Sequence, residues 1–142
     1  MAALRAICFF IFVSPALASE GFSLLCAYDK ATGFSMDSAE RWRVTRFEAE
    51  KKFVVRLIED DDSIYLMVDR PYGVFELGDN SGGLSCTKPS EKNRMYCDGL
   101  TREDMRIDLN TMRFLWVYSS GYTEGDENFS TPFMAIGRCS KI

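Results

Sequence analysis

The absence of histidine limits the catalytic chemistry open to this chain of 142 residues. Histidine carries the proton in Ser-His-Asp and Cys-His catalytic groups, so neither arrangement can be built here. Histidine is also a usual zinc ligand, and the sequence has no C-x-x-C pair that would bring two thiolates together. We therefore predict neither a catalytic nucleophile nor a zinc site.

Acidic residues leave one catalytic hypothesis open, because two carboxylates at a suitable separation can hydrolyse a glycosidic bond. The candidates are residues 59–62, Asp98, Glu103, Asp104, Asp108, Glu124, Asp126 and Glu127. Nothing in their spacing places two of them together, and numerous acids usually form a solvated face. We predict that the protein is not an enzyme, and keep a small hydrolase with paired carboxylates as one alternative.

Two acidic segments have the oxygen-rich composition of calcium loops. Residues 29–37 (DKATGFSMD) carry Ala31 at the third position, and residues 60–63 (DDDS) do not match the D-x-[DN]-x-[DN]-G pattern either. We interpret both segments as turns, and predict no metal and no other cofactor.

The N-terminal residues have the features of an export signal. Arg5 supplies a basic start, residues 6–13 (AICFFIFV) are too short to span a bilayer, and residues 15–18 (PALA) end with the small side chains that signal peptidase requires. We predict that residues 1–18 are a signal peptide cleaved before Ser19. Residues 19–142 are then a single periplasmic or secreted β domain with no transmembrane segment.

Four cysteines remain after this cleavage, and an even number in an exported chain indicates two disulfide bonds. The sequence allows three pairings. We favour Cys86 with Cys97, which would close a local hairpin, and Cys26 with Cys139, which would join the first strand of the domain to the last.

Short apolar runs alternate with turn residues along the chain, without a sustained period of 3.6 residues. The expected strands are residues 22–28, 42–47, 53–59, 64–69, 74–77, 84–87, 94–97, 105–109, 113–118 and 132–139, with turns at 60–63 and 78–83. A helix within residues 35–52 is the alternative for that segment, because Asp37 or Ser38 can cap it.

The clearest pairing signal lies in residues 105–109, where apolar and polar side chains alternate strictly. A turn centred on residues 110–111 places Met105 opposite Trp116 on one face of a hairpin. The same register sets Asp108 opposite Arg113 on the other face. We expect Trp116 to belong to the core, and a longer turn with an even shift of register stays open.

Ten short strands cannot lie flat in one small domain. Closing them into a barrel removes exposed edges, and a disulfide between the first and last strands suits that closure. We predict an all-β fold, an antiparallel meander closed into a β-barrel and held by disulfides. A two-sheet β-sandwich is the alternative.

The charge of the chain bears on its partners. Loss of the signal peptide removes one arginine and no acid, so the formal net charge of −4 becomes about −5, which argues against nucleic acid and anionic membranes. We expect a protein partner, with Tyr72, Tyr122 and Phe129 as exposed contact residues beside Gly and Pro. Asn128 begins a sequon that matters only in a host that glycosylates exported proteins.

The C-terminal third adds a family resemblance. Its residues follow Cys26 and Trp42 in the order Arg113-Phe114, Gly121-Tyr122, Thr131-Pro132-Phe133, Ile136-Gly137, Cys139 and Ser140-Lys141-Ile142. This order resembles small exported proteins of unknown function from alphaproteobacteria and their phages, over most of the chain after residue 18. The resemblance implies a periplasmic location and a disulfide-bonded β domain, and it implies no activity.

The leading functional hypothesis is a non-enzymatic binding protein that recognises another protein, as an inhibitor of a hostile hydrolase would. Periplasmic lysozyme inhibitors are small disulfide-bonded barrels, and an acidic surface would suit a basic lysozyme, although residues 119–122 (SSGY) do not match their S-G-x-x-Y motif. The second hypothesis is a carrier of a small apolar ligand, suggested by the aromatic content of 13%. A carrier needs an internal cavity of roughly 300 Å³ or more.

Overall fold

Ten β-strands and one 3₁₀ turn make up the regular structure of the computed structural model, which describes residues 21–64, 70–124 and 130–142. The strands are β1 (Leu24–Met36), β2 (Trp42–Phe47), β3 (Lys52–Leu57), β4 (Ser63–Ile64), β5 (Tyr72–Glu76), β6 (Ser81–Cys86), β7 (Arg94–Asp98), β8 (Glu103–Asp108), β9 (Arg113–Tyr118) and β10 (Phe133–Lys141), and the 3₁₀ turn η1 is Tyr122–Glu124. The predicted signal peptide, Asn128, Phe129 and most of the expected strand at 64–69 lie outside the described residues.

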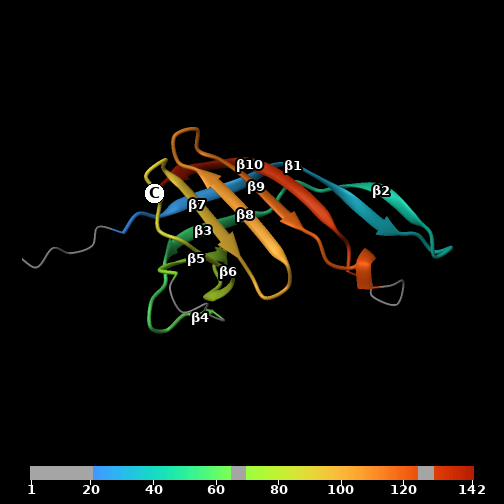
Figure 1. The fold of residues 1–142 in the computed structure, drawn as a ribbon, viewed down its shortest axis with the longest axis horizontal. Coiled ribbons are helices and arrows are strands. Elements are labelled where there is room, and N and C mark those ends of the chain that lie inside the picture. The colour runs from blue at the N-terminus through green and yellow to red at the C-terminus, as the bar shows by residue number, and fades with distance from the viewer. Residues whose placement is uncertain (1–20, 65–69, 125–129) are drawn as a thin grey trace, which may run out of the picture.

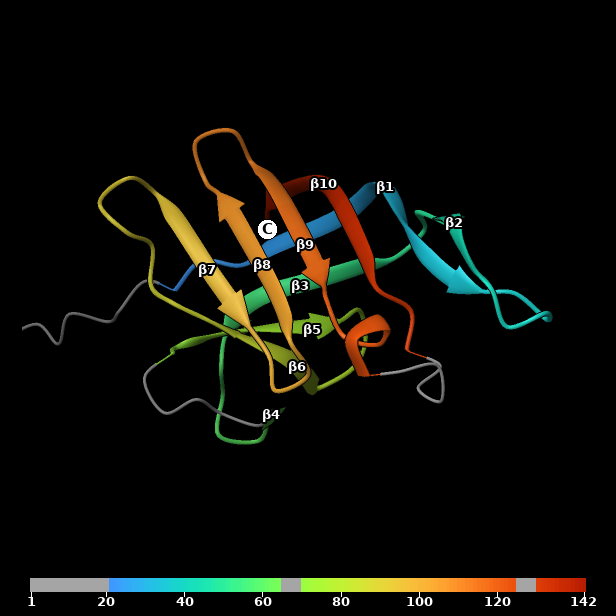
Figure 2. The same ribbon diagram turned by 45° about the vertical axis from the view of Figure 1, so that its right-hand side comes forward.

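Eight of the strands form a closed antiparallel barrel in the order β1, β3, β5, β6, β7, β8, β9 and β10. β10 returns to pair with β1, from Leu24 opposite Lys141 to Gly33 opposite Phe133. Figures 1 and 2 show the meander, with the red β10 beside the blue β1. The predicted closed barrel is confirmed and the sandwich alternative is excluded. Closure pairs the first strand with the last, which would otherwise be exposed edges.

β1 is longer than the sequence predicts. Its first half pairs with β3, and its second half pairs with β2 from Ala31 opposite Phe47 to Met36 opposite Trp42. β2 and β3 are thus two halves of one strand, interrupted at residues 48–51. The interpretation of residues 29–37 as a turn is wrong, because β10 and β2 pair with this segment from both sides and override its local turn preference.

The turn comes instead after Met36, at residues 37–41. The carboxylate of Asp37 accepts the backbone N–H groups of Ala39 (2.9 Å) and Arg41 (3.0 Å), so this residue caps a turn between two strands. The helix alternative for residues 35–52 is excluded, because β2 occupies the middle of that segment.

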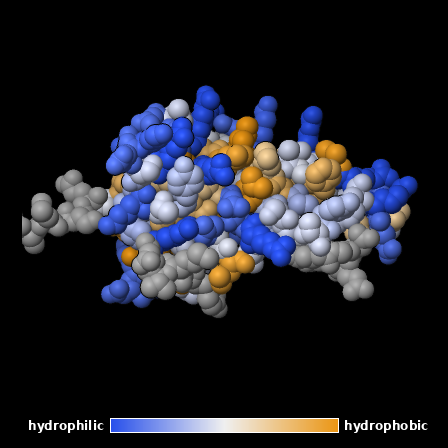
Figure 3. Space-filling model, in the orientation of Figure 1, coloured by the Kyte–Doolittle hydropathy of each residue, from blue (hydrophilic) through white to orange (hydrophobic). Residues whose placement is uncertain are grey.

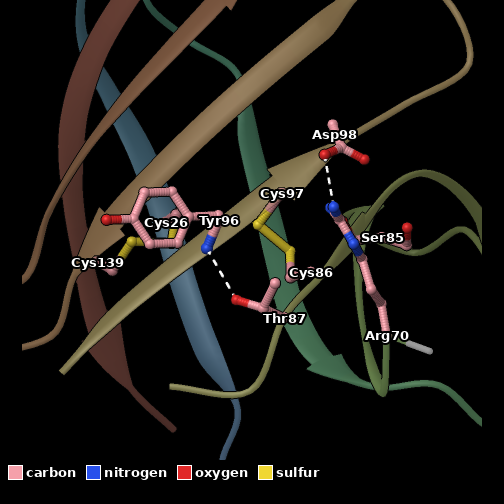
Figure 4. The surroundings of a disulfide bond; sticks show 9 residues. All are labelled: Cys26, Arg70, Ser85, Cys86, Thr87, Tyr96, Cys97, Asp98 and Cys139. Carbon is pink, nitrogen blue, oxygen red and sulfur yellow. Dashed lines mark hydrogen bonds and ion pairs between the residues drawn. A yellow bond between two sulfur atoms is a disulfide. The ribbon is translucent and has the colours of Figure 1, made fainter. Parts of the chain in front are cut away.

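Side chains and both disulfides fill the barrel interior. Cys26 is bonded to Cys139 between β1 and β10, and Cys86 to Cys97 between β6 and β7, which are the two pairs favoured from the sequence. Figure 4 shows both bonds within the barrel wall. Two such bonds fit an oxidising compartment. The cysteines pack in one cluster with Leu24, Phe53, Val55, Tyr72, Val74, Leu84, Met95, Met105, Ile107 and Phe114.

The β8–β9 hairpin has the register expected from the sequence. Met105 lies opposite Trp116, and Asp108 lies opposite Arg113. Asp108 also closes the turn by accepting two backbone N–H groups at 3.0 Å, while Met112 takes the left-handed conformation with φ of 54°. The register therefore holds with a four-residue loop between the paired ends.

Candidate functional site

A row of apolar side chains covers the outer face of β2, β1, β10 and β9. Val44 is 76% exposed, Phe34 52%, Met134 47% and Ile136 46%. We call these four residues, with the partly exposed Leu115 and Val117, the apolar stripe. Figure 3 shows apolar side chains gathered over this part of the molecule, bordered by hydrophilic ones. Exposed apolar side chains gathered in this way are typical of interaction surfaces.

The strand register makes the stripe continuous. Val44 lies opposite Phe34 across the β1–β2 pair. On the other side of β1, Met134 lies opposite Val117 and Ile136 opposite Leu115. Because opposite residues share a face, all six point outward. A shallow groove of about 420 Å³ runs beside Phe34, Val44, Val117 and Met134.

Basic side chains border the stripe. Lys30 and Arg106 lie opposite Ile136 and Leu115 in the register, and Arg46 and Arg113 stand at the ends of β2 and β9. Within the described part of the chain, none of these four bases forms an ion pair. The neighbouring Arg138 is instead held by Asp29, with nitrogen-to-oxygen distances of 3.0 and 3.1 Å. Acidic side chains also lie at this border, because Asp104 is opposite Val117, and the pKa of Asp29 is lowered by its hydrogen bond with Arg138 and by the charges of Arg113 and Lys30. Basic side chains nevertheless outnumber acidic ones around the stripe, although the whole chain is acidic.

The second half of β1 and β2 form an arm, residues 31–47, that projects beyond the barrel (Figures 1 and 2). Within the described residues β2 pairs with β1 alone, so its outer edge carries unpaired backbone groups. Asp37 fixes the tip through ion pairs with Arg41 and Arg43. The ring of Trp42, the first residue of β2 after the turn, lies 5.4 Å from that of Tyr122. The arm is therefore fastened near its tip, by ion pairs within the turn and by the contact with Tyr122.

A second feature is the barrel mouth, a cavity of about 210 Å³ at one end of the barrel. Its walls combine four aromatic rings with four charged side chains from the start of β3, the end of β5 and the start of β8. The lining includes Tyr28, Phe53, Trp116, Phe133, Lys51, Lys52, Glu76 and Glu103. The remaining interior is occupied by the packed core.

The charges of the barrel mouth are unequally buried. Burial raises the pKa of Glu103 above its ordinary value, although a hydrogen bond with Thr101 Oγ1 (3.3 Å) and the nearby Lys51 act in the opposite direction. Burial and the negative charges of Glu103 and Glu76 raise the pKa of Tyr28. The ammonium of Lys51 lies 3.7 Å from Glu76, and these two side chains are 72% and 76% exposed. The half-buried charge of the mouth is therefore negative.

The three aromatic residues expected to contact a partner differ in their surroundings. Tyr72 is 7% exposed and packs on Phe22 with ring centroids 4.9 Å apart, so its expected exposure is wrong. The strand β5 begins at Tyr72 and turns its ring into the barrel, which the preceding Pro71 does not reveal. Tyr122 is 64% exposed beside the arm, and Phe129 lies outside the described residues.

Three of the candidate acids are held in separate ion pairs. Asp62 pairs with Arg56, Asp98 with Arg70 at 2.7 Å, and Asp108 with Arg94 at 3.2 Å. Figure 4 shows the Arg70–Asp98 pair beside the Cys86–Cys97 bond. Among the candidates within the described residues, Glu103 alone lines the barrel mouth, together with Glu76, which is not a candidate from the sequence.

The apolar stripe could have been found from the sequence by counting from a cysteine. Because Cys139 points inward to its bond, alternation places Gly137 and Ala135 inside and Ile136 and Met134 outside. Small residues inside and large ones outside would then have indicated an exposed apolar face. The sequence holds no comparable pattern for the barrel mouth, because its lining residues come from strands that are distant in the chain.

No family model, no curated protein and no solved structure matches the chain. Searches of the described residues find no group of three or more Cys, Asp or Glu side chains arranged to hold a metal ion. Those residues likewise include no helix long and apolar enough to cross a membrane.

Proposed function

We propose that the protein is an exported, non-enzymatic binding protein that recognises another protein through the apolar stripe and its basic border. The observation that carries this proposal is the continuous row of six outward apolar side chains on a barrel whose core is already filled. Such side chains would be covered in the complex, where apolar burial stabilises association by roughly 25 cal/mol per Å² before its costs. Export, in this proposal, follows from the signal peptide of residues 1–18 and the two disulfides.

The charge around the stripe favours a partner that presents carboxylates next to apolar side chains. Lys30, Arg46, Arg106 and Arg113 would each meet an acidic group at the edge of the contact, where such pairs mainly set orientation and association rate. This differs from the basic lysozyme suggested by the overall charge of the chain, because basic side chains outnumber acidic ones around the stripe.

The other two hypotheses find less support. A carrier of an apolar ligand needs roughly 300 Å³ or more, and the barrel mouth offers about 210 Å³ with charged walls. For a glycoside hydrolase, Glu103 has the raised pKa that suits a general acid, but Glu76 is largely exposed and paired with Lys51. The mouth is also too small to surround a sugar ring and its neighbours.

Substitutions on the stripe test the proposal. Val44→Asp and Ile136→Asp place a carboxylate on exposed positions, so folding should be preserved. Leu77→Asp is the matched control, since Leu77 is 62% exposed in the β5–β6 turn, away from the stripe. Each variant is immobilised and exposed to the cell-envelope fraction of the source organism.

The expected result is a protein retained by the wild type and by Leu77→Asp and lost from both stripe variants. Retention of the same proteins by all four chains would contradict recognition through the stripe. Circular dichroism and intact disulfides in each variant show that a loss of binding does not reflect unfolding.

A further inference from the structure

The aromatic rings of the barrel mouth stand at large angles to one another. The plane of Trp116 lies at 89° to those of both Tyr28 and Phe53, with centroids 6.0 and 5.4 Å away. The ring centroid of Phe133 lies 6.4 Å from that of Trp116, with an angle of 49° between the two planes. The rings thus contact one another edge to face, and all four line the same cavity. The faces of aromatic rings carry partial negative charge, which attracts cations.

The electrostatics of the mouth add to this preference. Glu103 sits half-buried in the lining, and its field reaches the Tyr28 hydroxyl together with that of Glu76. The positive charges of Lys51 and Lys52, which also line the mouth, belong to exposed side chains, and Lys51 is paired with Glu76. Glu103 is partly removed from water and has no ion pair within the described residues. A bound cation would stabilise its charged form by replacing the lost hydration.

From this geometry we propose that the barrel mouth binds a small organic cation with an alkylammonium group, which contacts the rings of Tyr28, Phe53 and Trp116 and the carboxylate of Glu103. The volume of about 210 Å³ admits an ammonium group with its methyl or methylene substituents and excludes a drug-sized ligand. This site is separate from the apolar stripe, so it does not depend on the proposed protein partner.

Choline is the probe, and 3,3-dimethylbutan-1-ol is its control, because the alcohol has the same shape with a carbon in place of the charged nitrogen. The chain has two tryptophans, so Trp42→Phe leaves Trp116 as the reporter of the mouth. We expect choline to change the Trp116 fluorescence saturably, with an affinity at least roughly tenfold higher than that of the alcohol. Sodium chloride at matched ionic strength corrects for screening.

Two variants separate the proposed contact from general effects. Glu103→Gln keeps the shape of the side chain and removes its charge, so choline affinity should fall by roughly fivefold or more. Asp104→Asn is the matched control, since the adjacent Asp104 lies on the outer face opposite Val117, and its affinity should stay within about twofold of the wild type.

Three results would overturn the proposal. One is the absence of saturable choline binding up to about 50 mM, a concentration that fills a site of millimolar affinity. The second is equal binding of choline and the neutral alcohol, which would indicate an apolar pocket. The third is unchanged choline affinity in Glu103→Gln, which would place the cation elsewhere. None of these outcomes bears on the apolar stripe, so the two proposals fail independently.

Discussion

At the scale of single residues, Arg56 and Asp62 form the most enclosed ion pair among the described side chains. Two nitrogens of Arg56 donate to the two oxygens of Asp62 at 2.7 and 2.6 Å, and the Asp62 side chain is only 1% exposed. The backbone N–H of Glu59 donates to the same carboxylate at 2.7 Å. The guanidinium also lies 4.0 Å above the ring of Phe75. This pair fastens the turn after β3 to the barrel.

Asp62→Ala should lower the free energy of unfolding by about 2 kcal/mol at pH 7, because it removes charge-assisted hydrogen bonds from an enclosed site. The hydrogen bonds from Arg56 hold the pKa of Asp62 below its ordinary value, so their contribution is present above that value and is lost as pH falls through the lowered pKa. Urea unfolding at pH 7 and at acid pH measures both effects. The exposed Asp61→Ala is the control, and an equal loss in both variants would refute the role of the pair.

Glu103→Gln should have the opposite effect on stability. Burial raises the pKa of Glu103 above its ordinary value of 4.5, so the charged form opposes folding as pH rises through that range. The variant should unfold at higher urea concentration than the wild type at neutral pH and at the same concentration below pH 4.5. A less stable variant at neutral pH would contradict the burial of this carboxylate. A gain in stability with a loss of cation binding would mark Glu103 as a residue kept for function.

Single residues differ in how far the sequence predicts them. Cys26, Cys86, Cys97 and Cys139 were paired correctly, since one bond is local and the other joins the ends of the domain. The sequence predicts Tyr72 at the surface, because the neighbouring Gly and Pro are typical of a loop. Its burial depends on the direction in which β5 leaves Pro71, which local composition does not determine.

At the scale of elements, the arm depends on the turn of residues 37–41. Glu40 takes the left-handed conformation there, with φ of 56°. A side chain in that region is strained, whereas glycine adopts it freely. We expect Glu40→Gly to stabilise the arm by about 0.5–1 kcal/mol, and Glu40→Ala, which keeps the Cβ atom, to give no such gain.

Hydrogen exchange of the β2 amides measures this effect, because the arm can open without the barrel. Slower exchange in Glu40→Gly than in the wild type is the expected result. Faster exchange in the glycine variant would show that backbone entropy outweighs the relief of strain at this turn.

The sequence predicts elements that depend on neighbouring residues, such as hairpins. It does not predict elements that depend on pairing with strands far away in the chain. The β8–β9 register follows from strict alternation and from one charged pair, Asp108 with Arg113. Residues 29–36 carry Asp, Lys and Gly, which favour a turn, yet they extend β1 because β2 and β10 supply hydrogen bonds on both sides. The mouth combines Tyr28, Glu103 and Trp116 from three strands, and their meeting depends on how the barrel closes.

At the scale of the whole molecule, the Cys26–Cys139 bond fastens the closure of the barrel. It spans 113 residues of sequence, against 11 for Cys86–Cys97. In the chain-entropy model, replacing the first pair by alanine should cost about 5 kcal/mol and replacing the second about 3 kcal/mol. Urea midpoints of the two double variants measure the difference. A larger loss of stability on removing Cys86–Cys97 than on removing Cys26–Cys139 would contradict the view that barrel closure is the main contribution of the disulfides to stability.

Because packed side chains fill most of the barrel interior, we expect a partner to bind the outer surface. The core encloses both disulfides and the rings around Phe114, where Gly137 makes room, since a Cβ atom there would lie 2.6 Å from the Phe114 ring. The apolar stripe, by contrast, faces solvent along four strands. A molecule built this way presents a rigid surface to a partner and offers little internal volume to an apolar ligand.

Native mass spectrometry of the chain, recovered gently from its source organism, tests this account most directly. We predict a complex with one protein partner, absent when Val44→Asp or Ile136→Asp replaces the wild-type chain and present with Leu77→Asp. A bound apolar molecule of roughly a few hundred daltons, retained equally by all of these variants and without a protein companion, would contradict the account and favour a carrier.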